Sequence, residues 1–154
     1  MADWIFCATA SGVDEAKAQS LLRSHQAIHT LPPGIFTPWP GDPEPGDRLW
    51  LLWRARCTAD PTTLLGGGRV WGAPQDPYGL GLLWANSDCP GMKEEAERLG
   101  FKTAPVMFFI RLQSIVFPPD GVLLNPGGLG SLAVGLNEAT SAQVQIVNDL
   151  LSIP

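Results

Sequence analysis

The chain has 154 residues, of which 45% are hydrophobic and 16% are charged, and its formal net charge at pH 7 is −5. This apolar content excludes a disordered chain, the low content of charged residues excludes a coiled coil, and the length predicts a single domain over residues 1–154. Because the net charge is negative, attraction to nucleic-acid phosphates is not a property of the whole molecule and requires a local basic face.

The first residues and the cysteines bear on location and redox chemistry. The start, Met1 to Trp4, lacks the basic residues and apolar stretch of a signal peptide, and no apolar run reaches the roughly 18–20 residues that span a bilayer. We therefore expect a cytoplasmic protein without a membrane partner. The three cysteines are far apart and form no CxxC pair, so we expect neither a disulfide framework nor a zinc site.

The first third of the chain predicts a strand, a helix and a long loop. Residues 4–9 are apolar enough for a buried strand, and Ser11 with Asp14 three residues later has the form of a capping box for a helix over 13–26. Residues 31–46 contain six prolines, which forbid a helix or a central strand and favour an extended surface loop. That loop also carries aromatic rings, Phe36 and Trp39.

Residues 48–57 form the clearest strand pattern, because hydrophobic and polar residues divide between two faces with a period of two. One face is a core face. The other is a mixed cationic and aromatic face, on which we expect Trp50 to be a surface or pocket ring accompanied by arginine. The core face holds Leu49, Leu51, Trp53, Ala55 and Cys57, and the mixed face holds Arg48, Trp50, Leu52, Arg54 and Arg56.

The remaining elements complete an α+β pattern. A glycine-rich strand is expected over 64–73, where Gly66 to Gly68 allow a bulge, a bend or the close approach of another backbone. We predict a C-terminal helix over 142–152, capped by Thr140 or Ser141. Further predictions are short strands at 82–85 and 122–124, a helix at 94–99 that ends at Gly100, and a long central strand at 106–117.

Catalytic, metal-binding and cofactor-binding motifs are not evident in the sequence. There is no G-x-S-x-G nucleophile elbow, and the Gly66–Gly68 run lacks the lysine, the Ser/Thr and the helix of a P-loop. His25 and His29 have the i, i+4 spacing of ligands on a helix, but no glutamate lies between them in the HExxH manner and no third ligand is evident. We therefore assign no catalytic residue, metal or cofactor.

Several features occur together in the order of one known superfamily. They are the opening strand Trp4-Ile5-Phe6 and its helix, Pro45 to Arg48 before a hydrophobic strand, the Gly66 to Val70 strand, and a long late strand with a terminal helix. In this order the chain resembles the PUA-like superfamily, and within it the EVE type. The resemblance spans most of the chain and implies a small, curved, mostly antiparallel β-sheet or barrel flanked by two or three helices.

The resemblance implies a binding function. Many PUA-like domains bind RNA, or modified bases in DNA, in an aromatic-lined pocket. From strand parity and loop position we take Trp39, Trp50 and Trp71 as candidate pocket walls for a nucleobase or another flat ligand, and Arg54 and Arg69 as candidate contacts to phosphates or base edges. The simpler alternative is that the tryptophans only fill the core of a small domain.

Two other functions remain open at the level of sequence. The proline-rich segment with Phe36 and Trp39 is suited to a protein-interaction or homodimer interface, since aromatic residues concentrate binding energy there. An enzyme whose catalytic groups converge only in the folded chain is the third interpretation.

Overall fold

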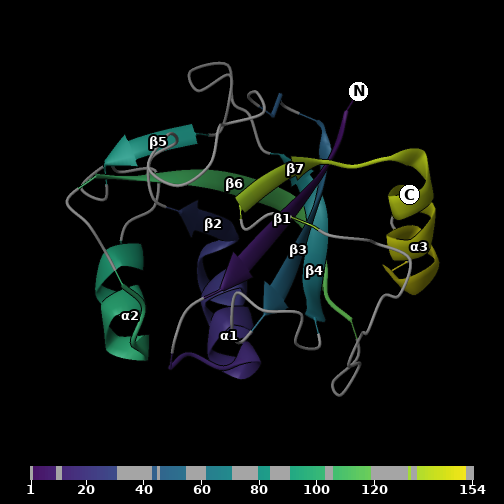
Figure 1. The fold of residues 1–154 in the computed structure, drawn as a ribbon. Helices are drawn as coiled ribbons and strands as arrows, with labels where there is room; N and C mark the ends of the chain where they lie inside the picture. The colour runs from purple at the N-terminus through teal and green to yellow at the C-terminus, as the bar shows by residue number, and fades with distance from the viewer. Residues whose placement is uncertain are drawn as a thin grey trace.

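The structure, a computed structural model, describes residues 2–9, 12–30, 43–44, 46–54, 62–70, 80–83, 91–102, 106–118, 132 and 135–151. These residues form seven strands and three helices (Figure 1). They are β1 (Asp3–Thr9), α1 (Glu15–His25), β2 (Ala27–Thr30), β3 (Arg48–Arg54), β4 (Thr62–Val70), β5 (Leu80–Leu83), α2 (Met92–Leu99), β6 (Val106–Val116), β7 (Gly135–Glu138) and α3 (Ser141–Leu151).

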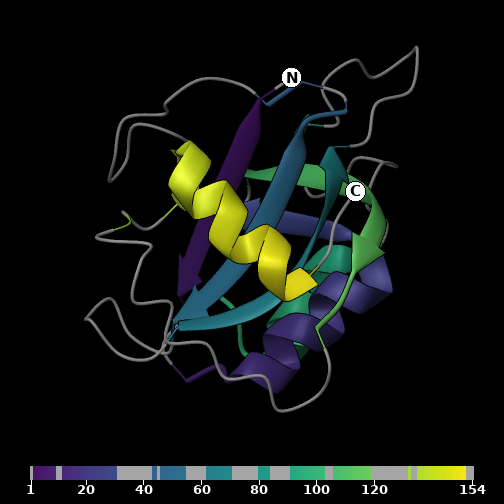
Figure 2. The same ribbon diagram turned by 90° about the vertical axis from the view of Figure 1, so that its right-hand side faces the viewer.

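The strands form one curled, mixed sheet in the order β2-β6-β4-β3-β1-β7, with β5 also paired to β6. The β1–β3 pairing is parallel and the other described pairings are antiparallel. The sheet curls into a half-barrel, with α1 on its inner face and α3 across β1 and β3 on its outer face (Figure 2). The expected α+β fold with a curved, mostly antiparallel sheet and two or three helices is confirmed.

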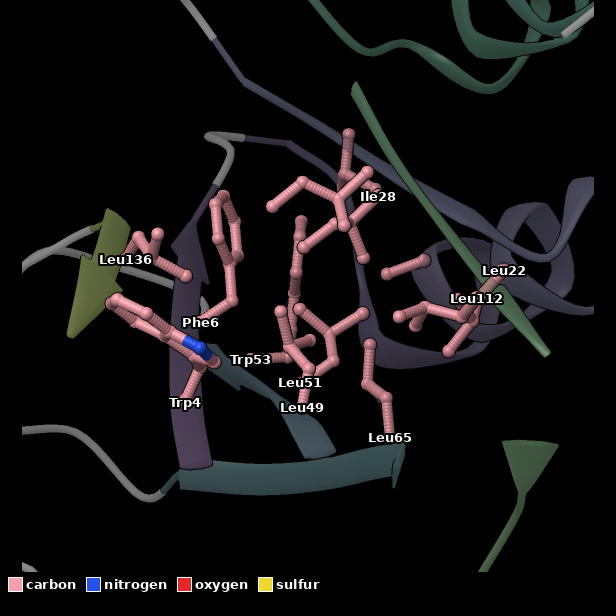
Figure 3. Close-up of a cluster of buried hydrophobic side chains, with 13 residues drawn as sticks. Trp4, Phe6, Leu22, Ile28, Leu49, Leu51, Trp53, Leu65, Leu112 and Leu136 are labelled. Atoms are coloured by element: carbon pink, nitrogen blue, oxygen red, sulfur yellow. The ribbon is translucent and has the colours of Figure 1, made fainter. Parts of the chain in front are cut away.

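The inner core fills the concave side of the sheet. Six strands contribute side chains to it, and α1 closes it through Val13, which precedes the helix, and through Ala18 and Leu22. The two strands at the ends of the sheet, β2 and β7, reach this one cluster through Ile28 and Leu136, which is the physical sign of the curl (Figure 3). The strand residues are Trp4, Phe6, Ile28, Leu49, Leu51, Trp53, Leu65, Ile110, Leu112 and Leu136.

The outer core lies between the convex face of the sheet and α3. Ile5 and Cys7 of β1 and Trp50 and Leu52 of β3 are fully buried there, together with Val147 of α3. The expected two faces of the 48–54 strand are therefore real, but the prediction that Trp50 is a surface or pocket ring is wrong. The helix α3, which begins more than 90 residues after Trp50, covers the face that the local pattern predicted to be exposed.

The helix boundaries differ from the expected ones for local reasons. The side chain of Asp14, rather than that of Ser11, caps α1 by accepting a hydrogen bond from the Lys17 backbone N–H at 2.9 Å. The helix ends at His25 because Gln26 adopts the left-handed conformation, with φ 51°. His29 then lies on β2, a strand that the sequence reading missed, so the two histidines do not share a helix face.

The other two helices match their local signals. Gly100, with φ 97°, ends α2 as expected, although α2 begins at Met92 rather than at residue 94. The backbone N–H of Thr140 donates to Gln143 Oε1, and the backbone N–H of Gln143 donates to Thr140 Oγ1, which is a capping box before α3. No helix among the described residues is long and apolar enough to cross a membrane.

Glycines in β4 leave room for a bulge in the neighbouring strand β6. Between the Gly67–Val116 and Arg69–Gln113 pairs, β6 contains one extra residue, and Ser114 there has a positive φ of 54°. A Cβ atom on Gly68 would lie 2.8 Å from the backbone oxygen of Gln113. The expectation that these glycines allow a bulge and the close approach of another backbone is confirmed.

Strands β1, β3, β4 and β6 lie where strands were expected, β5 overlaps the expected strand at 82–85 in two residues, and β7 was missed. The predicted strand tails at 55–57 and 71–73 and the predicted strand at 122–124 lie outside the described residues.

Candidate binding face

A row of polar side chains crosses the outer face of the sheet at the end where β3 begins and β4 ends. The strand register sets Arg48 of β3 opposite Asp3 of β1, Arg69 of β4 opposite Arg48, and Gln113 of β6 opposite Arg69. Residues that are directly opposite in a sheet share a face. We call Asp3, Arg48, Arg69 and Gln113 the polar row.

Arg48 is held firmly within this row. Its Nε and Nη2 atoms donate to the two carboxylate oxygens of Asp3 at 2.6 and 3.0 Å, a two-pronged ion pair. Its guanidinium carbon also lies 5.4 Å from the centre of the Trp50 ring, within the range of a cation–π contact. Arg48 thus forms the boundary between the polar row and the outer core beneath α3.

The turn before β3 is built around a buried carboxylate. Asp47, 3% exposed, accepts hydrogen bonds from Trp4 Nε1 at 2.9 Å and from the backbone N–H groups of Ala2 and Glu44 at 3.0 and 2.9 Å. Gly46 supplies the positive φ, 90°, that this turn requires. The Gly46-Asp47-Arg48 sequence therefore has a structural role, since each of the three residues holds β1, the turn or β3 in place.

Arg69 is the candidate residue that the fold places in the row. It is partly buried, and its Nη1 donates to the backbone oxygen of Gly46 at 3.0 Å. This bond ties the end of β4 to the turn before β3 and holds the guanidinium group at this end of the sheet.

Arg54 lies at the opposite end of the same pair of strands. It pairs with Thr62 at the start of β4, and its Nη1 donates to the backbone oxygen of Leu132 at 3.3 Å. The six positions from Arg48 to Arg54 correspond to about 20 Å along a strand. The structure therefore does not bring Arg54 and Arg69 together, although both were expected to contact the same ligand.

The structure describes one of the three candidate rings. Trp50 is 0% exposed, inside the outer core. Trp39 and Trp71 lie outside the described residues, but their chain positions are informative: Trp71 directly follows Val70, the last residue of β4, and Trp39 belongs to the segment that leads into β3. Because β3 and β4 are antiparallel, the first residue of β3 and the end of β4 lie at the same end of the sheet, the one that carries the polar row.

Two residues on β6 were missed by the sequence reading. Gln113 is exposed beside Arg69, and Arg111, two positions earlier, shares its face by strand alternation. The signal was the pair of large polar residues Arg111 and Gln113 in a strand whose other residues, apart from Ser114, are apolar. With Arg111 included, the row carries three guanidinium groups, of which that of Arg48 is paired with Asp3, on a chain whose net charge is −5.

A second polar cluster joins α1 to α2. Glu95 of α2 accepts a hydrogen bond from Ser24 Oγ at 3.2 Å, and its other oxygen lies 2.5 Å from His25 Nε2. Arg98 completes the cluster, with Nη2 at 3.7 Å from Glu95. The serine and the imidazole both contact the carboxylate, and the cluster packs beside the small apolar contact of Leu21, Ala27, Met92 and Ala96. We interpret it as the link that docks α2 on α1.

The described residues contain no group of three or more His, Cys, Asp or Glu side chains placed to hold a metal ion. Comparison of the chain with models of known protein families, and with curated protein sequences, finds no match.

Proposed function

We propose that this chain is a PUA-like domain of the EVE type that binds RNA or a modified nucleobase without catalysis. The observation that supports this most directly is the polar row with Arg111, which gathers three arginines on one face of an acidic chain. Such a face supplies the phosphate contacts that nucleic-acid binding requires, and the net charge of the whole molecule does not supply them.

The candidate site is narrower than the one expected from sequence. It keeps Arg69, Trp71 and Trp39, adds Arg111 and Gln113, and leaves out Trp50 and Arg54. Trp71 enters the proposal as the residue that follows β4 in the chain. Stacking of a base on an indole ring contributes about 1–3 kcal/mol and is available to unpaired bases.

The test is a titration of the protein with single-stranded RNA, single-stranded DNA and base-modified oligonucleotides, followed by tryptophan fluorescence. Binding through the proposed site quenches the emission at low salt. Arg69→Gln should weaken binding to every sequence and lower the slope of log affinity against log salt by about one, as expected for a lost phosphate contact. If none of these oligonucleotides quenches the emission at low salt, the proposal is wrong.

Arg54→Gln is the matched control. Both arginines are partly buried and both donate to a backbone carbonyl oxygen, but they lie at opposite ends of the β3–β4 pair. The site predicts a loss of affinity for Arg69→Gln and none for Arg54→Gln. Equal losses would mean that binding depends on overall charge rather than on this end of the sheet.

Self-association is a second candidate function, favoured by the edge of the sheet. β7 is the last strand in the sheet order, and among the described residues only β1 pairs with it. An open strand edge is a template for pairing with another chain, here a second copy. Mass measurement over a range of protein concentrations tests this, and a monomer at every concentration contradicts it.

A further inference from the structure

Gln113 is placed beside Arg69 by the bulge in β6. Leu112 faces the inner core, and strict alternation would turn Ser114 and Val116 to the same side. Instead, Ile115 packs against the inner core and Val116 packs against the outer core, because the extra residue, Ser114, shifts the alternation by one position. The bulge thus keeps apolar side chains on both faces and leaves Gln113 exposed on the outer one.

The neighbouring strand is adapted to this bulge. Gly68 lies against it so closely that a Cβ atom would be 2.8 Å from the Gln113 backbone oxygen and 3.3 Å from the Ile115 Cα atom. Ser114 adopts a left-handed conformation that few residues other than glycine tolerate without cost. Backbone strain of this kind gathers where a side chain must point in a particular direction, and bulges re-aim side chains beside binding sites.

The amide of Gln113 is available to a ligand. The side chain is exposed, and it takes part in none of the hydrogen bonds among the described residues. Its chemistry differs from that of its neighbour: a guanidinium group only donates hydrogen bonds, whereas a carboxamide has both a donor and an acceptor. Arg69 therefore suits phosphate or carbonyl oxygens, which every nucleotide has, whereas an amide matches the donor–acceptor edge of a particular base.

From this geometry we propose that Gln113 is the residue of the site that determines base preference, while Arg69 supplies affinity that does not depend on sequence. The proposal rests on the nucleic-acid function above and goes beyond it by assigning readout to a strand residue at a bulge.

The experiment compares four single-stranded RNA homopolymers of equal length, titrated against the whole chain by tryptophan fluorescence. Gln113→Ala and Gln113→Met should reduce the ratio between the tightest and the weakest homopolymer by about fivefold, the lower end of the range for a two-bond base contact. Both variants should keep the salt dependence of the unaltered protein. Gln113→Met keeps the length and most of the volume of the side chain, so it separates lost hydrogen bonds from lost packing.

Gln145→Ala, which removes an exposed amide on α3, is the control and should leave the ratio unchanged. Three results would overturn the proposal: equal affinity of the unaltered protein for all four homopolymers, an unchanged ratio in both Gln113 variants, or a uniform loss with all homopolymers. A separate result is that the unaltered protein binds none of the homopolymers and none of the DNA or base-modified oligonucleotides. That result would contradict the proposed function itself, and this inference with it.

Discussion

Trp4 and Asp47, 43 residues apart in sequence, are joined by a buried hydrogen bond of 2.9 Å from the indole Nε1 to the carboxylate Oδ2. The same carboxylate accepts from the backbone of Ala2 and of Glu44. One side chain thus fastens the first strand to the turn that begins β3, the strand beside it in the sheet.

Removing that carboxylate should destabilise the fold. Asp47→Ala leaves the Trp4 indole and two backbone N–H groups without their acceptor, and we expect a loss of about 3 kcal/mol in the free energy of unfolding. Urea denaturation, followed by circular dichroism, measures it. Asp149→Ala, which removes an exposed carboxylate on α3, should change the stability by less than about 0.5 kcal/mol. Similar effects of the two substitutions would contradict the structural role of Asp47.

The bulge makes a prediction of its own. Gly68→Ala would force a Cβ atom against backbone atoms of β6 that cannot move independently, so we expect a loss of about 2 kcal/mol or more. Ser114→Gly at the same bulge relieves a left-handed residue and should leave stability unchanged or raise it by up to about 1 kcal/mol. Thermal unfolding of both variants tests the pair, and a well-tolerated Gly68→Ala would exclude the close approach.

Trp50 should behave as a core residue. Its Nε1 has no hydrogen-bond partner in the part of the chain that the structure describes, so Trp50→Phe should remove packing contacts without removing a hydrogen bond, and we expect a loss of about 1–2 kcal/mol. The variant should retain the oligonucleotide affinity of the unaltered protein, measured by fluorescence anisotropy of a labelled oligonucleotide. A stable variant that has lost affinity for the oligonucleotide would show that Trp50 contributes to the binding site.

The cluster between α1 and α2 should control local rather than global stability. Glu95→Ala removes the hydrogen-bond acceptor of Ser24, which is exposed, and the partner of His25, which is partly buried. We expect a loss of about 1 kcal/mol in the free energy of unfolding. Hydrogen exchange should be faster in α2 and unchanged in β1 and β3. Glu94→Ala, the exposed neighbouring position, is the control. Equal exchange in the two variants would argue against a docking role for the cluster.

Local chemistry was sufficient to predict most of the elements. The period of two in residues 48–54 and the capping pattern before residue 141 depend on near neighbours in the chain, and the structure has β3 and α3 there. Gly100 ends α2 for the same reason. β2 was not predicted because only Gln26 separates it from α1, and β7 was not predicted because it is only four residues long.

The local pattern predicts which residues share a face: Trp50 with Arg48 and Leu52, and Leu49 with Leu51 and Trp53. It does not predict which face meets solvent, because α3 covers Trp50 from the far end of the chain. Antiparallel pairing set Arg54 and Arg69 at opposite ends of two strands, and the β6 bulge brought Gln113 beside Arg69. These relationships depend on strand register between distant segments, which the periodicity within one segment does not contain.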